Sequence, residues 1–455
     1  MSFADFLAVL QNTKAGGPRA HGPPSCGPDA RGPDARGPDT RGPDTRGPDT
    51  RGPDARADHT HGPSASARHD NGSPTAARAA AASAAAAQAA TLPTAAVAAG
   101  VAPSVAALIA PLRTGLQALP AGTAVAGIGL SGGADSAMLA ACAAALCAAP
   151  AHVGHWPRLV LYHVHHGLYD EADAWSRQAE GLAAALSLPL RILKVQVHGA
   201  TGAGIEAAAR VARYEALSQA ARDDGVSHLL LAHHRDDQAE TVLLRLLRGS
   251  GPQGLAAMAP VARRDGLTYL RPWLDVARTD ILAVASACTQ LTGWQPVSDP
   301  SNADPRYTRA ALRTQLTPVL DARWPGWQRM LARHARLAAA SAEILDEVAS
   351  DDLRGLQPDA DGAGFSLQAW RALSPARQAH VLRHWLGRQG AQMPGEARLA
   401  DLIRQLRQLH ALGHDRHLVW ESGGHRVRCE RGRVRIETRS RRKDETAARG
   451  GDDGT

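Results

Sequence analysis

The residues best suited to chemistry form the segment Ser131-Gly132-Gly133-Ala134-Asp135-Ser136, which follows a short apolar run at 124–130. The glycines let backbone N–H groups approach an anion, the serines offer hydroxyls, and a helix that begins here adds partial positive charge. The segment therefore predicts a phosphate cradle. Asp135 would repel phosphate unless a divalent cation lay between them, so we expect Mg²⁺ held by Asp135 and phosphate oxygens. The alternative is an ordinary turn and helix cap.

Other polar groups follow the later apolar runs. The pairs His165-His166 and His233-His234 each end such a run, and Arg210 and Arg213 lie three apart on a predicted helix. Ligands of parallel α/β sheets bind at the carboxyl ends of the strands, so we expect these groups to converge. The two arginines could neutralise charge on a phosphate. They could equally be exposed helix arginines in an arginine-rich chain. The histidines could hold zinc, but Mg²⁺ already accounts for the carboxylates nearby.

Asp237 and Glu240 lie three residues apart where another predicted helix begins. This spacing lets both side chains face one pocket. Two carboxylates suit a substrate with a long cationic side chain, because they can hold the cation and help remove a proton from its amine. The alternative is that the helix dipole alone favours acids at this end.

Short apolar runs and helical patterns alternate through this region, which predicts a parallel α/β sheet with helices on both faces. The runs lie at 124–130, 159–164, 190–197 and 228–232, and the helical patterns at 135–147, 171–186, 205–224 and 235–247. Beyond 320 the sequence predicts a smaller, mainly helical domain, with helices at 328–350, 367–389 and 396–412 and a hairpin at 427–436. The domains predicted are 121–320 and 321–440, and the tail 441–455 should be disordered.

Residues 1–120 have a different composition. Six tandem copies of Gly-Pro-Asp-(Ala/Thr)-Arg occupy 27–56, and an alanine-rich tract follows at 79–99. Each pentapeptide carries a helix breaker, an anion and a cation, with nothing to bury. We therefore expect 1–120 to be a disordered low-complexity extension whose removal leaves folding nearly unchanged.

Composition excludes several classes of protein. The chain has 455 residues, a net charge of +7 and 51 basic residues, of which only Lys14, Lys194 and Lys443 are lysine. None of these lysines follows a glycine, so a Walker A loop is absent. The five cysteines are irregularly spaced, which argues against a disulfide scaffold or a zinc ribbon. No secretory leader or membrane span is evident, so we expect a cytoplasmic protein without a membrane partner.

The segment 131–136 resembles the pyrophosphate-binding loop of the N-type ATP pyrophosphatases (the PP-loop superfamily), whose fold is adenine-nucleotide α-hydrolase-like. Taken with 163–168, 204–214, 232–241, 248–251 and 299–313, it resembles the tRNA(Ile)-lysidine synthetase family. The similarity is close over 121–320 and looser over 321–437. The length resembles the short form of that family, without its extra C-terminal domain. One departure is Ala310, where the family usually has asparagine, and it weakens the roles assigned to Arg309 and Arg313.

The resemblance implies ATP and Mg²⁺ as cofactors, and free L-lysine and the CAU-anticodon isoleucine tRNA as partners. The enzyme would first adenylate the carbon-2 oxygen of the wobble cytidine, releasing pyrophosphate. Lysine would then displace AMP and join carbon 2. The residues implied in catalysis are Asp135, Arg210, Asp237 and Glu240. Those implied in binding ATP are Ser131, Gly132, Gly133, Ala134, Asp135, Ser136, His165, His233, Arg210 and Arg213, and Asp135 would hold the metal.

Two alternatives stay open. One is a PP-loop tRNA thiolase, which would need reactive cysteines, whereas Cys142 and Cys147 lie in the first helical pattern as core residues. The other is a non-catalytic RNA-binding protein with a vestigial nucleotide fold, against which the intact polar residues argue. Arginines recur after residue 320, and they suit either phosphate contacts or ordinary solvated faces. The sequence does not predict the oligomeric state.

Overall fold

The structure is a computed structural model that describes Phe6, Ala8 and residues 94–148, 156–167, 171–196, 204–409 and 418–438. The pentapeptide repeats and the tail 441–455 lie outside the described residues. Contacts within the chain separate it into two units, Met1–Lys14 with Ala98–Thr455, and Ala15–Val97. The elements that position the site belong to the first of these.

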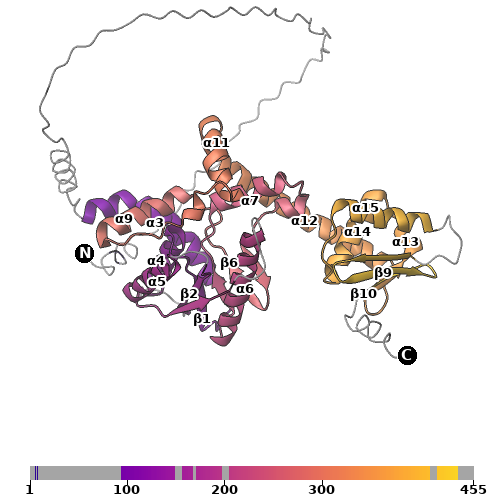
Figure 1. Cartoon of the computed structure of the whole chain (residues 1–455), viewed down its shortest axis with the longest axis horizontal. Coiled ribbons are helices and arrows are strands. Elements are labelled where there is room, and N and C mark those ends of the chain that lie inside the picture. The colour runs from indigo at the N-terminus through magenta and orange to yellow at the C-terminus, as the bar shows by residue number, and fades with distance from the viewer. Residues whose placement is uncertain are drawn as a thin grey trace, which may run out of the picture. The chain divides into compact units, whose positions relative to one another are not determined.

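A six-stranded sheet forms the centre of the N-terminal domain (Figure 1). Its strands run in the order β3 (Leu190–Lys194), β2 (Arg158–His165), β1 (Val125–Gly129), β4 (His228–Leu230), β6 (Leu267–Leu270) and β5 (Val261–Arg264). All neighbours are parallel except β5 and β6. The helices between the strands are α4 (Ala134–Ala148), α5 (Ala172–Ala185), α6 (Gly204–Asp223) and α7 (Arg235–Leu246). The predicted parallel α/β class is confirmed.

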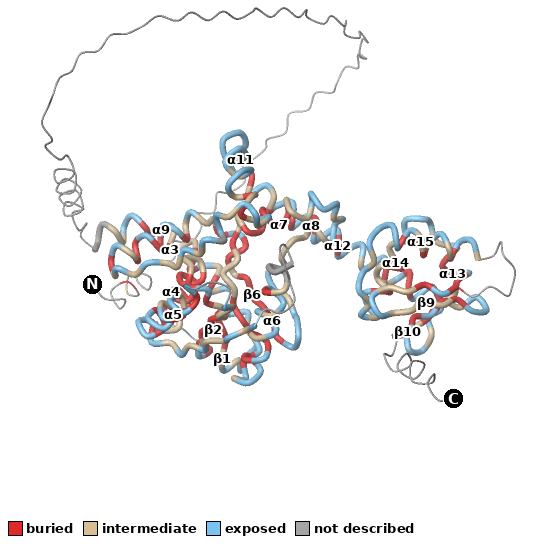
Figure 2. Tube along the Cα trace, viewed as in Figure 1, coloured by how far each residue is buried: buried red, intermediate tan, exposed pale blue. Residues whose placement is uncertain are grey.

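Helices cover the sheet on two sides. Figure 1 shows α4 and α5 on one side and α6 on the other. Helix α4 is buried along most of its length and packs against β1, β2 and α9 (Arg278–Thr292). Its alanines leave little side-chain volume, which lets neighbouring backbones approach closely. This burial shows as the red stretch at α4 in Figure 2.

The hairpin β5–β6 was not expected from the sequence. Its turn is Asp265-Gly266, and both residues have positive φ, 52° and 78°. This is the backbone of a type I′ turn, for which Asp-Gly is a preferred pair. The signal was present, but the strands have only four residues each and carry no clear alternation.

Helix α3 (Thr94–Gln117) corrects the expectation that residues up to 120 form no packed structure. One face of it is buried, through Val101, Val105, Leu108, Ile109, Leu112 and Leu116. The Trp273 indole N–H donates to the Leu108 carbonyl at 3.0 Å, and the Ser104 hydroxyl donates to Asp280 at 2.9 Å. The alanine-rich composition hid these larger aliphatic residues, which recur at helical spacing.

The same helix is the one described segment with the length and apolar composition of a membrane span, at Val97–Gln117. Its mean hydropathy is 1.4, and 28% of the apolar window is buried within the protein. Its contacts with Trp273 and Asp280 attach it to the N-terminal domain. Packing of the buried face accounts for the aliphatic residues without a membrane.

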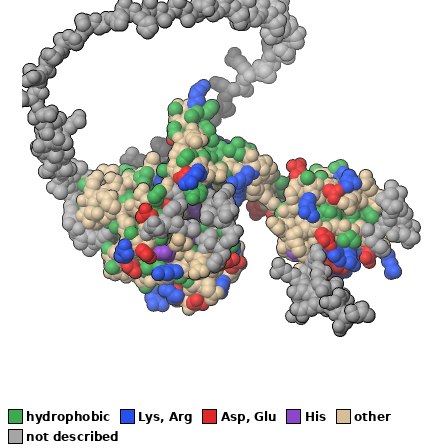
Figure 3. Space-filling model, viewed as in Figure 1, with side chains coloured by type: hydrophobic (Ala, Val, Ile, Leu, Met, Phe, Trp, Pro, Cys, Tyr) green, Lys and Arg blue, Asp and Glu red, His purple; other side chains and the backbone are tan. Residues whose placement is uncertain are grey.

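Short helical segments connect α9 to the next domain. They are η1 (Pro300–Asn302), α10 (Thr308–Ala311), a π-helical turn η2 (Leu312–Leu316) and α11 (Thr317–Arg323). Helix α11 exposes Val319, and Trp324 just beyond its end is also exposed. Apolar side chains over this projection are green in Figure 3. A further short helix, α8 (Pro252–Leu255), follows α7.

The C-terminal domain is mainly helical, as expected. Helix α12 (Trp327–Gly355) leads into it, and α13 (Leu367–Ala372), α14 (Pro375–Arg388) and α15 (Glu396–Gln408) follow. An antiparallel sheet completes it, in the order β7 (Gly364–Ser366), β10 (Arg433–Thr438), β9 (His425–Glu430) and β8 (Leu418–Ser422). The predicted hairpin is β9–β10, with Arg431 and Gly432 at positive φ in its turn. Strands β7 and β8 were not predicted. Trp370, Trp385 and Phe365 lie fully buried in its core.

Candidate functional site

The predicted phosphate cradle is the connection between β1 and α4. Gly132 has φ +87°, a conformation that favours glycine. Its carbonyl accepts the Val297 N–H at 3.0 Å, and a Cβ at this position would lie 2.8 Å from Val297 Cγ2. Both the backbone angle and the close approach of Val297 therefore require glycine here.

Ser136 fixes the shape of this loop. Its buried hydroxyl accepts the Ser131 N–H at 3.0 Å and donates to the Gly133 carbonyl at 3.2 Å. The Ser131 hydroxyl lies 3.0 Å from that of Ser136 but belongs to an exposed residue. The first N–H groups of α4 have no intrahelical acceptor, because a helix leaves its first turn unpaired. Ser131 and these N–H groups can bind a phosphate.

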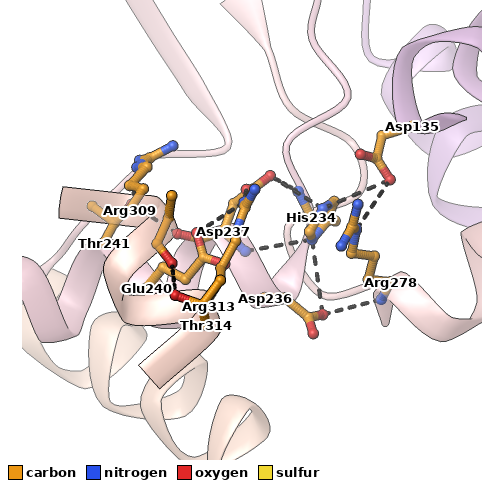
Figure 4. Close-up of polar contacts among 11 residues, drawn as sticks. Asp135, His234, Asp236, Asp237, Glu240, Thr241, Arg278, Arg309, Arg313 and Thr314 are labelled. Carbon is orange, nitrogen blue, oxygen red and sulfur yellow. Dashed lines mark hydrogen bonds and ion pairs between the residues drawn. The ribbon is translucent and has the colours of Figure 1, made fainter. Parts of the chain in front are cut away.

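Asp135 lies in the first turn of α4, with an oxygen that has no hydrogen bond. Its Oδ1 is buried and lacks a hydrogen-bond partner. His234 Nε2 and Arg278 Nε each lie 3.8 Å from this oxygen (Figure 4). An unsatisfied buried carboxylate oxygen beside a phosphate cradle is the donor that a hard divalent cation requires. Asp135 therefore fits a Mg²⁺ ligand.

His234 connects the cradle with α7. It is 1% exposed and caps α7, because its Nδ1 accepts the Asp237 N–H at 3.4 Å while its own N–H donates to Asp237 Oδ2 at 3.2 Å. In the neutral ring this leaves the proton on Nε2, which lies 3.8 Å from Asp135 Oδ1 and 3.4 Å from Asp237 Oδ2. From the sequence we expected His234 to converge with the other histidines at this edge of the sheet. Its place before Arg235-Asp236-Asp237 also suits a helix cap, which was not predicted.

The side chains of Asp237 and Glu240 lie on the same face of α7, as their spacing predicted, and Arg313 binds both. Arg313 Nε donates to Glu240 Oε1 at 2.6 Å, and its Nη2 donates to Glu240 Oε2 at 3.0 Å and to Asp237 Oδ1 at 3.2 Å. Such a two-pronged guanidinium–carboxylate pair is among the stronger polar contacts in proteins. Figure 4 shows Arg313 lying along the face of α7 that carries the two acids.

The charges around Asp237 set its protonation. Burial alone raises the pKa of Asp237, but His234, His233 and Arg313 outweigh burial and hold the pKa below its usual value. Asp237 is therefore ionised near neutral pH. Burial lowers the pKa of His233 to about 4, and Arg271 and nearby arginines act in the same direction. His233 is consequently neutral, and its buried Nδ1 has no hydrogen-bond partner.

A second group of predicted residues lies at the end of β2 and on α6. His166 Nε2 accepts the Arg213 Nε–H at 3.2 Å, and burial with Arg213 lowers the pKa of His166 to about 4. Arg210 is exposed and stacks over the Tyr214 ring, 5.2 Å from its centroid, yet it is close enough to lower the pKa of His233. His165 ends β2, and its Nε2 lies 3.0 Å from Asp173 of α5.

Two further arginines were missed or given little weight. The Arg278 backbone N–H, at the start of α9, donates to Asp236, and its side chain approaches Asp135. No local pattern marks Arg278. Arg309 donates to the Thr241 hydroxyl at 3.1 Å despite the buried Ala310 beside it. Arg309 and Arg313 thus reach α7 although Ala310 stands where the family usually has asparagine. The π-helical turn carries Arg313.

The alternatives find little support here. The described residues contain no group of three or more histidine, cysteine, aspartate or glutamate side chains placed to hold a metal ion. Burial raises the pKa of Cys142, and it raises those of Cys147 and Cys288 to about 11. These thiols are therefore protonated core groups and poor nucleophiles. Cys26 lies outside the described residues.

Two parts of this chain match known protein families. Residues 110–320 match the family model of the PP-loop domain, and residues 365–435 match that of the TilS substrate binding domain. A PP-loop domain with a parallel sheet, followed by a mainly helical part, defines the class: this is an ATP-utilising enzyme of the PP-loop type.

Relatives narrow the class to a family. The tRNA(Ile)-lysidine synthase of Bordetella parapertussis is 60% identical over 332 residues, 73% of this chain and 95% of the relative. That of Bordetella pertussis is 61% identical over 322 residues, 71% and 98% of the two chains. Among solved structures, the U34-tRNA thiolase NcsA of Methanococcus maripaludis aligns with 52% of this chain and 80% of its own, at 16% identity and TM-score 0.41. The chain belongs to the tRNA(Ile)-lysidine synthase family, and it is a ligase.

Proposed function

We propose that this enzyme converts the wobble cytidine of the CAU-anticodon isoleucine tRNA to lysidine in the cytoplasm. ATP adenylates the carbon-2 oxygen of the base and pyrophosphate leaves. The ε-amine of free L-lysine then forms a bond to carbon 2, and the oxygen departs with AMP. The observation that carries the proposal is the place of His234 between Asp135 of the phosphate cradle and Asp237 of the acidic pair.

The cradle and its neighbours are assigned to the first step. Ser131, Gly132, Gly133, Ala134 and Ser136 supply N–H groups and hydroxyls for the phosphates of ATP. Asp135 would hold Mg²⁺, which when bound neutralises charge on the phosphate oxygens. Its otherwise unsatisfied Oδ1 supports this assignment.

The basic and imidazole groups complete the nucleotide site in this proposal. Arg210 and Arg213 are assigned to stabilise charge that develops on the α-phosphate. His165 and His233 are assigned to bind the nucleotide. His233 suits the role because a buried, neutral ring with an unpartnered Nδ1 can hydrogen-bond a ligand without adding charge.

Asp237 and Glu240 are assigned to the second step. They hold the lysine ammonium and help to take up its proton before the amine attacks. The lowered pKa of Asp237 favours the first of these roles for that residue, since a carboxylate with a low pKa binds a cation well and accepts a proton poorly. Arg313 neutralises part of the charge, so the pair and Arg313 together carry one net negative charge for an incoming cation.

One reconstituted reaction tests the proposal. Purified protein is incubated with ATP, Mg²⁺, labelled lysine and unmodified CAU-anticodon isoleucine tRNA, and the nucleosides of the digested tRNA are identified by mass spectrometry. The proposal expects label only at the wobble position and one pyrophosphate released per lysine joined. Methionine tRNA, which has the same anticodon, serves as the control substrate. Incorporation of sulfur in place of lysine would favour the thiolase alternative and contradict the proposal.

A further inference from the structure

Helix α12 has an exposed apolar stripe that its own chain does not cover among the described residues. Met330, Leu337 and Ile344 are 48%, 57% and 61% exposed, and they lie seven residues apart. Val348 continues the stripe at 37% exposure. The long exposed stretches of this helix are pale blue in Figure 2.

The face of α12 next to this stripe packs against the rest of the chain. Ala332, Ala335, Ala338, Ala342 and Ala349 are buried there. Helix α12 contacts α7, α8 and α14 within the chain. Small residues on the covered face and large apolar residues on the exposed face are the reverse of what a surface helix of a monomer needs. The exposed face therefore behaves as a second packing surface.

The spacing of this face is that of a coiled-coil seam. A repeat of seven residues keeps side chains in line along a helix that supercoils with a partner, whereas a straight helix drifts off the line. With Met330, Leu337 and Ile344 at one seam position, His334, Ser341 and Val348 occupy the other, and all six are exposed. The seam is therefore apolar at four of its six positions.

The charges beside the seam are complementary under a two-fold rotation. Arg333 and Glu347 flank it on one side with Ala340 midway between them, and all three are exposed. Within the part of the chain that the structure describes, neither charged side chain has an ion-pair partner. If the same face met itself antiparallel, each Arg333 would lie beside a Glu347 of the other copy. Ala340 would lie near the two-fold axis, where a larger side chain would keep the two helices apart.

We propose that α12 pairs antiparallel with α12 of a second copy of this chain, through the seam from Met330 to Val348. The arrangement seats Leu337 against Ser341, Ile344 against His334 and Met330 against Val348, so each polar seam residue meets an aliphatic one. A parallel pair would bring the two His334 rings together and place Ala338 beside Arg333. Arg333 and Glu347 would then both lack an ion-pair partner across the seam. The rotation that relates the copies closes on itself, so the assembly stops at two chains.

The seam is short, about three heptads, so the dimer should dissociate on dilution. Analytical ultracentrifugation over a concentration series of the full chain tests this directly. The wild-type chain is expected to shift from the mass of one chain to that of two as concentration rises. Leu337→Glu should hold it at the mass of one chain. Leu282→Glu, which adds the same charge at an exposed leucine of α9, is the matched control and should leave the dissociation constant unchanged.

Charge reversal tests the direction of pairing. Arg333→Glu and Glu347→Arg should each raise the dissociation constant about three- to tenfold, because each places like charges together twice. The double variant Arg333→Glu/Glu347→Arg should restore it. Circular dichroism checks that each variant folds.

Three outcomes overturn the proposal. One is the mass of a single chain at every concentration. Another is a Leu337→Glu variant that associates like the wild type. The third is loss of association by Leu337→Glu with no effect of charge reversal, which would indicate a different pairing. Should Arg333→Glu weaken tRNA binding while the wild type stays a single chain, this face belongs to RNA instead.

Discussion

Arg313 Nε lies 2.6 Å from Glu240 Oε1, although the two residues are 73 positions apart in the chain. The same guanidinium also reaches Asp237, so both acids of α7 are held by a segment beyond α9. The two carboxylates proposed to bind lysine are thus already arranged around a cation. A site shaped this way is pre-organised for positive charge, which reduces the ordering that a ligand must supply.

Replacing Asp135 by asparagine should abolish the first step. Asparagine keeps the shape of the side chain but removes the charge that a divalent cation needs. Pyrophosphate release in the presence of the tRNA should fall at least about 100-fold, as for loss of a group that stabilises the transition state. Asp351→Asn on the exposed face of α12 is the control. Pyrophosphate release at the wild-type rate in Asp135→Asn would refute the metal assignment.

Replacing Glu240 by glutamine should separate the two steps. The substitution removes the one net negative charge that Asp237, Glu240 and Arg313 carry together, so the KM for lysine should rise at least about tenfold, which corresponds to about 1.4 kcal/mol. Pyrophosphate release that depends on tRNA should persist. Glu343→Gln, an exposed position on α12, provides the comparison. Unchanged lysine KM together with lost pyrophosphate release would move Glu240 into the nucleotide site.

Removing Arg313 should destabilise the protein as well as the site. In Arg313→Gln, Asp237 and Glu240 become two buried acids without their guanidinium, and breaking such a pair costs about 3 kcal/mol. Urea unfolding followed by circular dichroism measures this. Arg306→Gln removes an exposed arginine paired with Asp304 and should change the free energy of unfolding by less than about 0.5 kcal/mol. Equal effects of the two substitutions would contradict the importance of the buried contact.

Truncation should distinguish α3 from the residues before it. A chain that begins at residue 94 keeps α3 but loses Phe6, which is fully buried, so it should lose a little thermal stability while it retains ligase activity. A chain that begins at residue 118 loses the buried face of α3 and should unfold at a distinctly lower temperature. Leu108→Ala, at a fully buried position, should alone cost about 2–5 kcal/mol. If both truncations unfold alike, the packing of α3 contributes nothing to stability.

Stability should fall when the pH drops from 6.5 toward 4. Burial lowers the pKa of His166 and of His233 from 6.5 to about 4 in the folded state. Between these values the unfolded chain binds more protons than the folded one, so the free energy of unfolding decreases with falling pH. Above pH 6.5 neither residue contributes to the pH dependence. His233→Gln should flatten the decline in urea midpoint, and an unaltered slope would contradict the shifted pKa.

Local signals predicted the parts of the site that are close in sequence. The strand, glycine turn and helix around Ser131–Ser136 follow from residues within one turn of each other, and the i, i+3 spacing placed Asp237 and Glu240 on one face. Arg313 and Arg278 reach the site through tertiary packing, which no periodicity encodes. The sequence suggested the segment containing Arg313 only by resemblance.

Element predictions failed where composition obscured a pattern. Large aliphatic residues recur every three or four positions along α3. The alanines and prolines between them suggested a continuation of the low-complexity tract. Strands β5 to β8 have three to five residues each, too few for alternation to stand out. Their pairing partners in the sheets stabilise them more than their own propensities do.

The π-helical turn at Leu312–Leu316 has a consequence for comparing relatives. A π-turn is a helix with one residue inserted, and removing that residue restores the α-helical repeat and rotates every later side chain about the axis. A one-residue gap in an alignment at this turn would therefore not be a neutral length change. Where the gap precedes Arg313, it would mark a protein in which the aligned arginine no longer points at the acids of α7.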